Sequence, residues 1–341
     1  MLRKLNHTVA ITWLLIVSFV MSGMPAFAAP PAVEEVLSLL GMDQGQITEL
    51  AQGKPVTYAL AENGADDLAM GIALYLPVSS AKMSKYLQQE NPDPLDVDVT
   101  TYGILTEHSG AASLASVALP TEEAEALLDA EPGDKFNLSA VEIDSFKTLK
   151  QLSAKTTEDA ILQHYRELLF QRFEAYRHGG TYAIAPYVRD ENPDSKPSQE
   201  LHQAASASVI LSRYFPALYK AWLDYPQPLP PGTDESFPWV EKTVERRLAV
   251  ILRHRISVGW NGGILVLTRE FYAPHSYNSS QWLTGCLAYR DGTVVFKQVH
   301  SYTDQVAGTA SEIKHIIGRQ LLKDKLLTSF ARLCRVSGQC F

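Results

Sequence analysis

Apolar residues alternate with polar ones along the last third of the chain. Four segments rich in β-branched and aromatic residues follow one another at 248–258, 263–272, 282–289 and 293–303. Asn261-Gly262 and Asp291-Gly292 separate successive segments. Asn or Asp followed by Gly is the strongest short signal for a hairpin turn. The pattern therefore predicts an antiparallel meander.

A helical period follows the meander. From Ser311 to Leu333 we predict one amphipathic helix, and its expected apolar face is Ile313, Ile316, Ile317, Leu321, Leu327 and Phe330. A second helix is predicted from Thr157 to His178, ended by Gly179-Gly180. A sheet and a helix each need the other to cover an apolar face. We therefore predict an α+β fold, with an antiparallel sheet wrapped on a long C-terminal helix and a central helical segment.

Three regions follow residues 1–28. Residues 29–150 read as an α+β segment, with strands at 56–61, 68–76 and 97–106 between short helices. Residues 151–232 read as helical and end in a proline-rich linker at 226–232. Residues 233–341 hold the meander and the last helix, and can form one compact domain with the N-terminal part. One large domain and two domains both stay open at this length.

The first 28 residues have the layout of a secretion signal. Arg3 and Lys4 precede an uncharged run of 13 residues from Val9 to Met21, and Ala26-Phe27-Ala28 has the small residues of a cleavage site. A bilayer-spanning helix needs about 20 apolar residues. We expect cleavage after Ala28, a periplasmic or secreted location, and no membrane span in the mature chain.

The acidic net charge of the chain bears on whether it binds nucleic acid. The chain has 38 acidic and 30 basic side chains, and the signal segment removes Arg3 and Lys4 but no acid. Phosphate neutralisation by Lys and Arg supplies most of the affinity for nucleic acid. The basic groups noted are short, Arg246-Arg247 and Arg253 with Arg255, so we expect no nucleic-acid partner.

The three cysteines lie near the C-terminus, in a chain that the signal directs to an oxidising compartment. Cys334 and Cys340 are close enough in sequence to form a disulfide. Cys286 then remains as a buried thiol. Pairing of Cys286 with Cys334 or Cys340 also stays open.

Familiar catalytic motifs are missing from the sequence. It contains no Gly-x-Ser-x-Gly, no His-Glu-x-x-His, no glycine-rich phosphate loop and no Cys-x-x-Cys. Glu312 and His315 have the spacing of a di-iron ligand pair, but such a site needs this pair twice with two further glutamates. We expect no catalytic residues, metal or cofactor.

Candidate binding residues come from strand alternation. His254 shares a face with apolar neighbours on its strand, and Glu270 and Tyr272 share a face on the next strand. If these faces are concave, His254, Glu270, Tyr272 and His300 converge as polar anchors of an apolar pocket. In the opposite register Arg253, Arg255 and Arg269 line it and favour an anionic head group.

Two parts of the chain resemble known protein families. Hairpins followed by one long helix, at about 236–335, resemble the helix-grip fold of START and Bet v 1-like lipid-binding proteins. The run 117–134, ending in Gly133-Asp134, together with Gly179-Gly180-Thr181 and Pro186-Tyr187, resembles an uncharacterised family of secreted bacterial proteins. That second resemblance implies no known reaction. Members often have cysteines near this turn, where the present sequence has Ala130 and Lys135.

These observations favour non-catalytic binding of a lipid or other apolar small molecule in the periplasm, between the sheet and the last helix. One alternative is an envelope hydrolase that uses His254 and Glu270 as a proton-transfer pair, which requires the two side chains to be within hydrogen-bond reach. Another is an interaction module of an envelope assembly, which requires a large exposed apolar patch.

Overall fold

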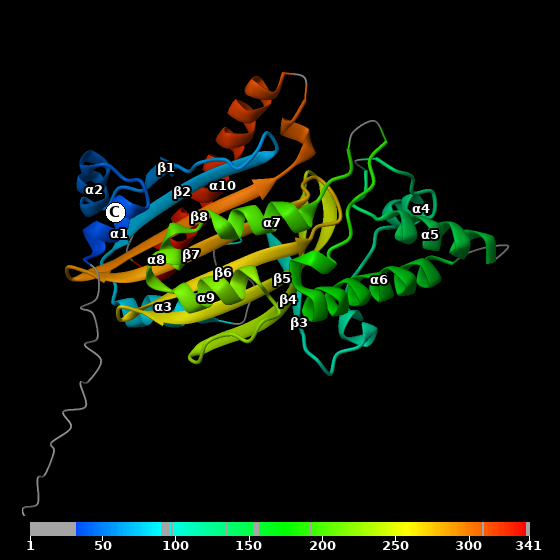
Figure 1. Ribbon diagram of the computed structural model, residues 1–341, viewed down its shortest axis with the longest axis horizontal. Helices are drawn as coiled ribbons and strands as arrows, with labels where there is room; N and C mark the ends of the chain where they lie inside the picture. The colour runs from blue at the N-terminus through cyan, green and yellow to red at the C-terminus, as the bar shows by residue number, and fades with distance from the viewer. Residues whose placement is uncertain are drawn as a thin grey trace, which may run out of the picture. The chain divides into compact units, whose positions relative to one another are not determined.

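Strands from both ends of the chain meet in one antiparallel sheet (Figure 1). The computed structural model describes residues 32–89, 96, 98–133, 135–152, 157–190, 193–308 and 310–338. The sheet has eight strands in the order β1-β2-β8-β7-β6-β5-β4-β3. They are β1 (Val56–Ala59), β2 (Asp67–Leu76), β3 (Val99–Leu105), β4 (Thr233–Val244), β5 (Arg247–Trp260), β6 (Gly263–Tyr272), β7 (Ser279–Tyr289) and β8 (Gly292–Tyr302).

Helices cover both faces of the sheet. One face, here the α7 face, packs against α1 (Val33–Leu39), α2 (Gln44–Ala51), α4 (Thr121–Leu128), α5 (Ala140–Leu152), α6 (Glu158–Gly179), α7 (Pro197–Ser206), α8 (Val209–Tyr214) and α9 (Pro216–Leu223). The other, the α10 face, packs against α3 (Ser80–Gln88) and α10 (Ser311–Ser337). Short 3₁₀ turns lie at η1 (Ala111–Leu114), η2 (Gly180–Ala183) and η3 (Asp304–Val306). In Figure 1 α7 and α9 lie in front of the sheet and α10 behind it.

This layering explains why the central strands are apolar on both sides. On β6, Leu265 and Leu267 pack on the α7 face, whereas Ile264 and Val266 pack on the α10 face. Alternate residues of a strand point to opposite faces, so a sheet covered twice needs apolar residues at consecutive positions.

The predicted fold class is confirmed: the protein is α+β, with an antiparallel sheet and a long C-terminal helix. Two elements, β4 and α5, were not predicted. Strand β4 contains Pro238 and the charged residues Glu241 and Lys242, which obscure its period. The segment 226–232 lies between strands of the same sheet, since β1 to β3 precede it and β4 to β8 follow it.

The predicted apolar face of the last helix is wrong in its first half. Ile313, Ile316, Ile317 and Leu321 are 62, 65, 56 and 66% exposed, and do not face the sheet. The buried side of α10 is instead formed by Leu326, Phe330 and Leu333.

Some predictions concern residues that the structure does not describe. The signal segment 1–28 and Cys340 lie outside the described residues, so the proposed signal and the Cys334–Cys340 disulfide stay predictions. Cys286 is a free, buried thiol, so it does not pair with either of them. Among the helices that the structure describes, none combines the length and apolar character needed to cross a bilayer.

Candidate functional site

The two central candidates, His254 and Glu270, lie on opposite faces of the sheet. The β5–β6 register pairs His254 with Arg269 and Arg253 with Glu270. His254 contacts Tyr176 and Trp222 on the α7 face, and Glu270 binds Arg253 and Tyr277 on the α10 face. The predicted convergence of these two side chains is therefore wrong, and they do not form a proton-transfer pair.

Tyr272 was assigned to the face of Glu270 and lies on the other one. The β5–β6 register shifts between Leu252 and Arg253, so that Leu252 pairs with Tyr272 and Arg253 with Glu270. Phe271 is the extra residue, and both Phe271 and Tyr272 pack in the core of the α7 face. A β-bulge reverses the alternation beyond it, and alternation alone does not reveal one.

His254 and Arg269 belong to a buried polar network. Tyr176 Oη lies 2.8 Å from His254 Nδ1 and accepts a hydrogen bond from Arg269 Nη1 at 3.0 Å. His254 Nε2 lies 2.9 Å from Glu235 Oε1. Burial lowers the pKa of His254 to about 4, against the opposing effect of Glu235. The imidazole is therefore neutral, and this network holds α6 and α9 against the sheet.

His300 and Arg255 lie outside the His254 network, at two other positions in the molecule. His300 Nδ1 lies 2.9 Å from Asp67 Oδ2, and the residue lines a cavity of about 280 Å³ between α7, α8 and the sheet, with Leu211, Leu267 and Leu283 among its apolar walls. Arg255 donates to the carbonyl oxygens of Leu87 and Gln89, the last at 2.9 Å, and so binds the C-terminal end of α3.

A second cavity, of about 180 Å³, lies between the sheet and α10. We call it the charged cavity. Its ionisable lining consists of Asp96, Lys242, Glu270, Tyr277, Lys297 and Lys325, and Trp282, Val299, Leu322 and Leu326 are among its apolar walls. The residues come from β4, β6, β7, β8 and α10 and from two connecting segments. Of the predicted site residues, this cavity contains Glu270.

The two carboxylates of the charged cavity are held by ion pairs. Lys242 Nζ lies 3.0 Å from Asp96 Oδ2 and 3.6 Å from Glu270 Oε1. Arg253, 1% exposed and lying behind them, donates to Glu270 Oε1 from Nη2 at 2.7 Å and also binds Asp96.

Ionisation in the cavity follows from these contacts. Burial would raise the pKa of Asp96 and of Glu270, but the charges of Lys242 and Arg253 outweigh it, so both pKa values are lowered. Tyr277 donates to Glu270 Oε2 at 2.6 Å, and burial together with that carboxylate raises the pKa of Tyr277 well above its usual value. The carboxylates therefore stay charged, and Tyr277 stays protonated.

Lys297 and Lys325 add positive charge to this lining. Lys297 is buried, with its Nζ 4.5 Å from the centre of the Trp282 ring. Lys325 is 48% exposed, and its Nζ lies 3.5 Å from Asp98 outside the lining. Among the described residues, the cavity is thus lined by three lysines and two carboxylates, with Arg253 bonded to both acids. The cavity meets solvent beside Lys325.

Part of the lining of the charged cavity can be recognised from the sequence. Lys297 lies two residues from Val295 and from Val299, so alternation places it on the inward face of β8. Lys242 was not considered because its strand was not predicted. Lys325 was not predicted because the expected apolar face of α10 differs from the face that packs on the sheet.

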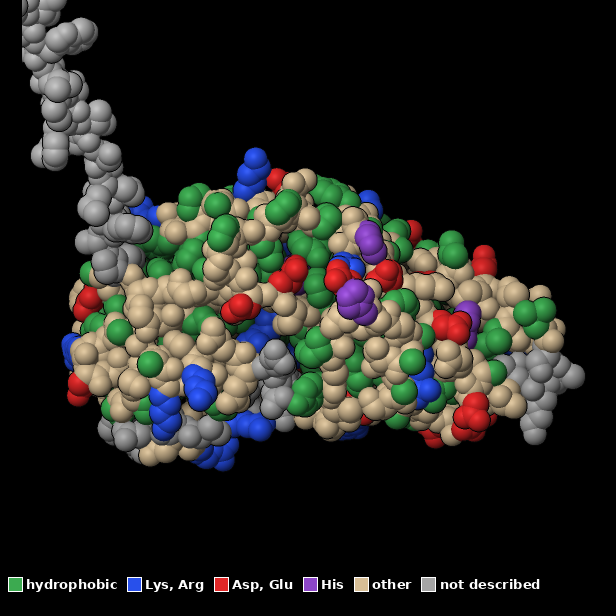
Figure 2. All heavy atoms as spheres, turned by 90° about the horizontal axis from the view of Figure 1, so that it is seen from below, with side chains coloured by type: hydrophobic (Ala, Val, Ile, Leu, Met, Phe, Trp, Pro, Cys, Tyr) green, Lys and Arg blue, Asp and Glu red, His purple; other side chains and the backbone are tan. Residues whose placement is uncertain are grey.

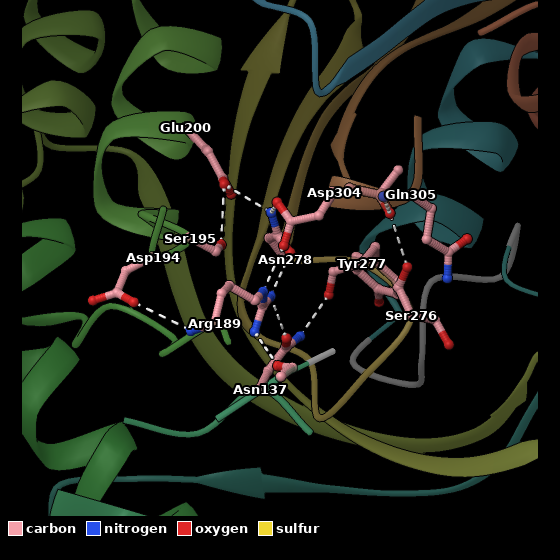
Figure 3. A network of polar contacts seen from close by, with 12 residues as sticks. Asn137, Arg189, Asp194, Ser195, Glu200, Ser276, Tyr277, Asn278, Asp304 and Gln305 are labelled. Atoms are coloured by element: carbon pink, nitrogen blue, oxygen red, sulfur yellow. Dashed lines mark hydrogen bonds and ion pairs between the residues drawn. The ribbon is translucent and has the colours of Figure 1, made fainter. Parts of the chain in front are cut away.

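A polar network beside the cavity holds Tyr277 in place (Figure 3). Asn137 Nδ2 donates to the carbonyl oxygen of Tyr277 at 2.8 Å. Arg189 donates to Asn137 Oδ1 at 2.9 Å and to Asn278 Oδ1 at 3.1 Å, and pairs with Asp304 at 2.7 Å. The β6–β7 connection is therefore fixed on several sides, which orients the Tyr277 hydroxyl toward Glu270.

Figure 2 shows one face of the molecule, on which acidic side chains are spread widely and basic ones are densest toward the lower left but also occur at the top and in the middle. Within the described residues, no group of three or more His, Cys, Asp or Glu is arranged to hold a metal ion.

Comparison of the chain with protein-family models, curated proteins and solved structures found no match. The resemblances to helix-grip proteins and to a secreted bacterial family therefore stay predictions. The assignment of function depends on the geometry of the site.

Proposed function

We propose that this protein binds a small molecule that combines an anionic group with a short apolar part, in the charged cavity between the sheet and α10. The observation that carries this proposal is the lining of that cavity, in which cationic side chains outnumber carboxylates. Both carboxylates are already engaged by Lys242 and Arg253. An anion that enters the cavity would come within reach of Lys297 and Lys325, which also line it.

Physical chemistry favours an anion at this position. Charges removed from bulk water gain stabilisation when an opposite charge comes within hydrogen-bond distance. Asp96 Oδ1 is buried without a hydrogen-bond partner among the described residues, and a donor on the ligand or a water molecule would satisfy it. Trp282 and Leu326 offer apolar contact to the rest of the ligand.

The cavity volume limits the size of the ligand. A volume of about 180 Å³ is below the range of roughly 300–1,000 Å³ typical of drug-sized ligands. Since a water molecule takes about 30 Å³ in the liquid, a short-chain acid fits better than a whole lipid. The function proposed here is binding, because Tyr277 stays protonated and both carboxylates are ion-paired, so none of these three groups is placed to accept a proton.

Thermal unfolding of the full chain with sodium butyrate, 1-butanol and inorganic phosphate tests this proposal. Butyrate and butanol share an apolar body, but only butyrate has a carboxylate. We expect butyrate to raise the Tm by several degrees near saturation, because a ligand at a hundred times its Kd stabilises the fold by about 2.7 kcal/mol. Butanol should not raise it, and phosphate tests whether an anion suffices.

Two variants on the same helix separate cavity binding from general salt effects. Lys325→Met removes a cavity charge at a half-exposed position, and Lys323→Met removes a charge that does not line the cavity. The first should weaken butyrate binding at least tenfold, and the second should leave it unchanged. An equal butyrate response in both variants, or no response in the wild-type protein, would disprove the proposal.

We also infer that the protein is exported and acts in the periplasm or outside the cell. The signal-like layout of residues 1–28 supports this location.

A further inference from the structure

The outer side of α10 carries a stripe of large apolar side chains. Ile313, Ile316, Ile317 and Leu321 are each more than half exposed. Their spacing of three, four and eight residues places them along one side of the helix. We call this group the outer stripe. The opposite side of the same turns faces the protein, where His315 contacts the carbonyl oxygen of Ala65 at 2.7 Å.

The outer stripe is not explained by the fold. In the described part of the chain, these four side chains contribute little to the core, because the α10 face is covered by Leu326, Phe330 and Leu333 further along the helix. Clustered, exposed aliphatic side chains on a soluble fold mark sites of interaction with a partner or a membrane.

The charge of α10 is opposite to that of the rest of the protein. The whole chain has a formal net charge of −8. Between Ser311 and Gly338, however, six basic residues accompany two acids; the basic residues are Lys314, Arg319, Lys323, Lys325, Arg332 and Arg335, and the acids are Glu312 and Asp324.

Three of these cations have partners within the molecule. Arg319 pairs with Glu62, and Lys325 lies 3.5 Å from Asp98 and lines the charged cavity. Lys314 donates to the carbonyl oxygen of Ala307 at 3.1 Å. Lys314 and Lys323 flank the outer stripe, since one residue of helix turns by about 100° and places them on either side of Ile313. Long basic side chains at such positions extend their charged ends past an apolar stripe toward an anionic surface.

We propose that α10 docks on an anionic lipid bilayer, with the outer stripe inserted at the level of the head groups and the flanking lysines on acidic lipids. A helix with a basic polar side and an apolar stripe binds in this way, parallel to the membrane plane. This inference is independent of the proposed function, since it does not use the cavity.

The size of the stripe favours a bilayer over a protein partner. It extends for about 12 Å of helix, at a rise of about 1.5 Å per residue. A stable protein interface buries about 800 Å² on each partner and involves about 20 residues or more. Four side chains on a convex helix are too few for such an interface, whereas insertion of each into a lipid layer needs no complementary partner shape.

Vesicle flotation of the full chain tests the proposal. We expect the protein to float with vesicles of three parts phosphatidylcholine and one part phosphatidylglycerol, and not with pure phosphatidylcholine vesicles. Raising the salt concentration from 50 to 500 mM should reduce binding, because attraction between surface charges is screened over about 3 Å at 1 M but over about 10 Å at 0.1 M.

Matched variants identify the surface that binds. Ile316→Glu with Ile317→Glu puts two charges into the outer stripe, and flotation should fall at least tenfold. Val141→Glu with Leu152→Glu makes the same change at residues of α5 that are 79 and 80% exposed, and binding should remain. Any contribution of residues 1–31 is common to both variants. Thermal unfolding checks that each variant is folded.

Three results would overturn the proposal. The first is failure to float with the acidic vesicles, and the second is equal loss in both double variants. The third is a wild-type dimer in light scattering that Ile316→Glu with Ile317→Glu converts to a monomer, because the outer stripe would then bind a second copy of the chain.

Discussion

Glu200 shows how burial changes the chemistry of a single residue. It is 5% exposed and accepts hydrogen bonds from Ser279 Oγ at 2.6 Å and from Asn278 Nδ2 at 3.0 Å. Figure 3 shows Glu200 beside Asn278 and Ser195. Burial raises the pKa of Glu200 from 4.5 to about 7, against those hydrogen bonds, which lower it. This carboxyl group therefore titrates near neutral pH.

The raised pKa predicts a loss of stability with rising pH. The folded state holds a proton on Glu200 more tightly than the unfolded chain does, so this contribution is complete below pH 4.5 and is lost as the pH rises through about 7. Glu200→Gln should remove the dependence and increase the free energy of unfolding by up to about 3 kcal/mol at pH 8, with a much smaller gain at pH 5. Urea unfolding at the two pH values measures this.

The exposed Glu125→Gln variant serves as the control for that experiment. Parallel pH profiles for Glu200→Gln and wild-type protein would show that Glu200 does not carry the titration.

Single residues were predicted from the sequence where alternation holds and missed where it fails. Alternation separates Arg253 from His254, as the β5–β6 register confirms. Lys297 was not predicted, although alternation along β8 places it inward. The error at Tyr272 has a physical cause, because the bulge at Phe271 is set by packing between strands and has no local sequence mark. The site therefore needed the register, which sequence alone did not provide.

Among the turns, one was predicted correctly and one was predicted one residue away from its observed position. Asn261 and Gly262 form the predicted β5–β6 turn with φ of 50° and 69°. The β7–β8 turn is shifted by one residue from the prediction, since Tyr289 pairs with Gly292 and the turn residues are Arg290 and Asp291. Gly292 is needed there for close approach, because a Cβ would meet the carbonyl oxygen of Leu76 at 2.3 Å.

The β4–β5 turn lacks a glycine where its backbone favours one. Glu245 and Arg246 have φ of 50° and 69°, the same geometry as Asn261-Gly262. A left-handed conformation costs a residue with a side chain roughly 1–2 kcal/mol. Arg246→Gly should therefore stabilise the protein by about 1 kcal/mol, and Gly262→Ala should destabilise it by about the same amount. Thermal unfolding measures both, and changes of the same sign would contradict this interpretation.

Helices and strands were predicted best where turn residues or an uninterrupted period mark them. The meander after residue 246 and helix α6 follow their periods closely. Strand β4 was missed because inward-facing Lys242 interrupts its apolar period, and that residue belongs to the charged cavity. Helix α10 was misread because it is apolar on two sides, one against the sheet and one at the surface. Both errors occur at the positions that we associate with function.

At the scale of the whole molecule, helices on both faces leave the sheet with two separate interiors. The α7 face contains the neutral His254 network and the cavity lined by His300, whereas the α10 face contains the ion pairs of the charged cavity. The sequence predicted one interior that contains an apolar pocket. It could not predict two, because the covering of the second face depends on how the central helices pack.

Export predicts a defined mature chain. If the signal is cleaved after Ala28, intact mass measurement of protein recovered from the periplasm or medium should give a chain that begins at Ala29. Ala26→Arg and Ala28→Arg together should prevent cleavage, because the cleavage site requires small residues. A protein that keeps residues 1–28 and stays in the cytoplasm would contradict the proposed location.

The most direct test of the charged cavity is a crystal of the protein soaked in sodium selenate, whose selenium is located by anomalous scattering. We expect a selenium peak inside the cavity between the sheet and α10, within contact of Lys297 or Lys325. A cavity without such a peak, in crystals that bind selenate elsewhere on the surface, would contradict it.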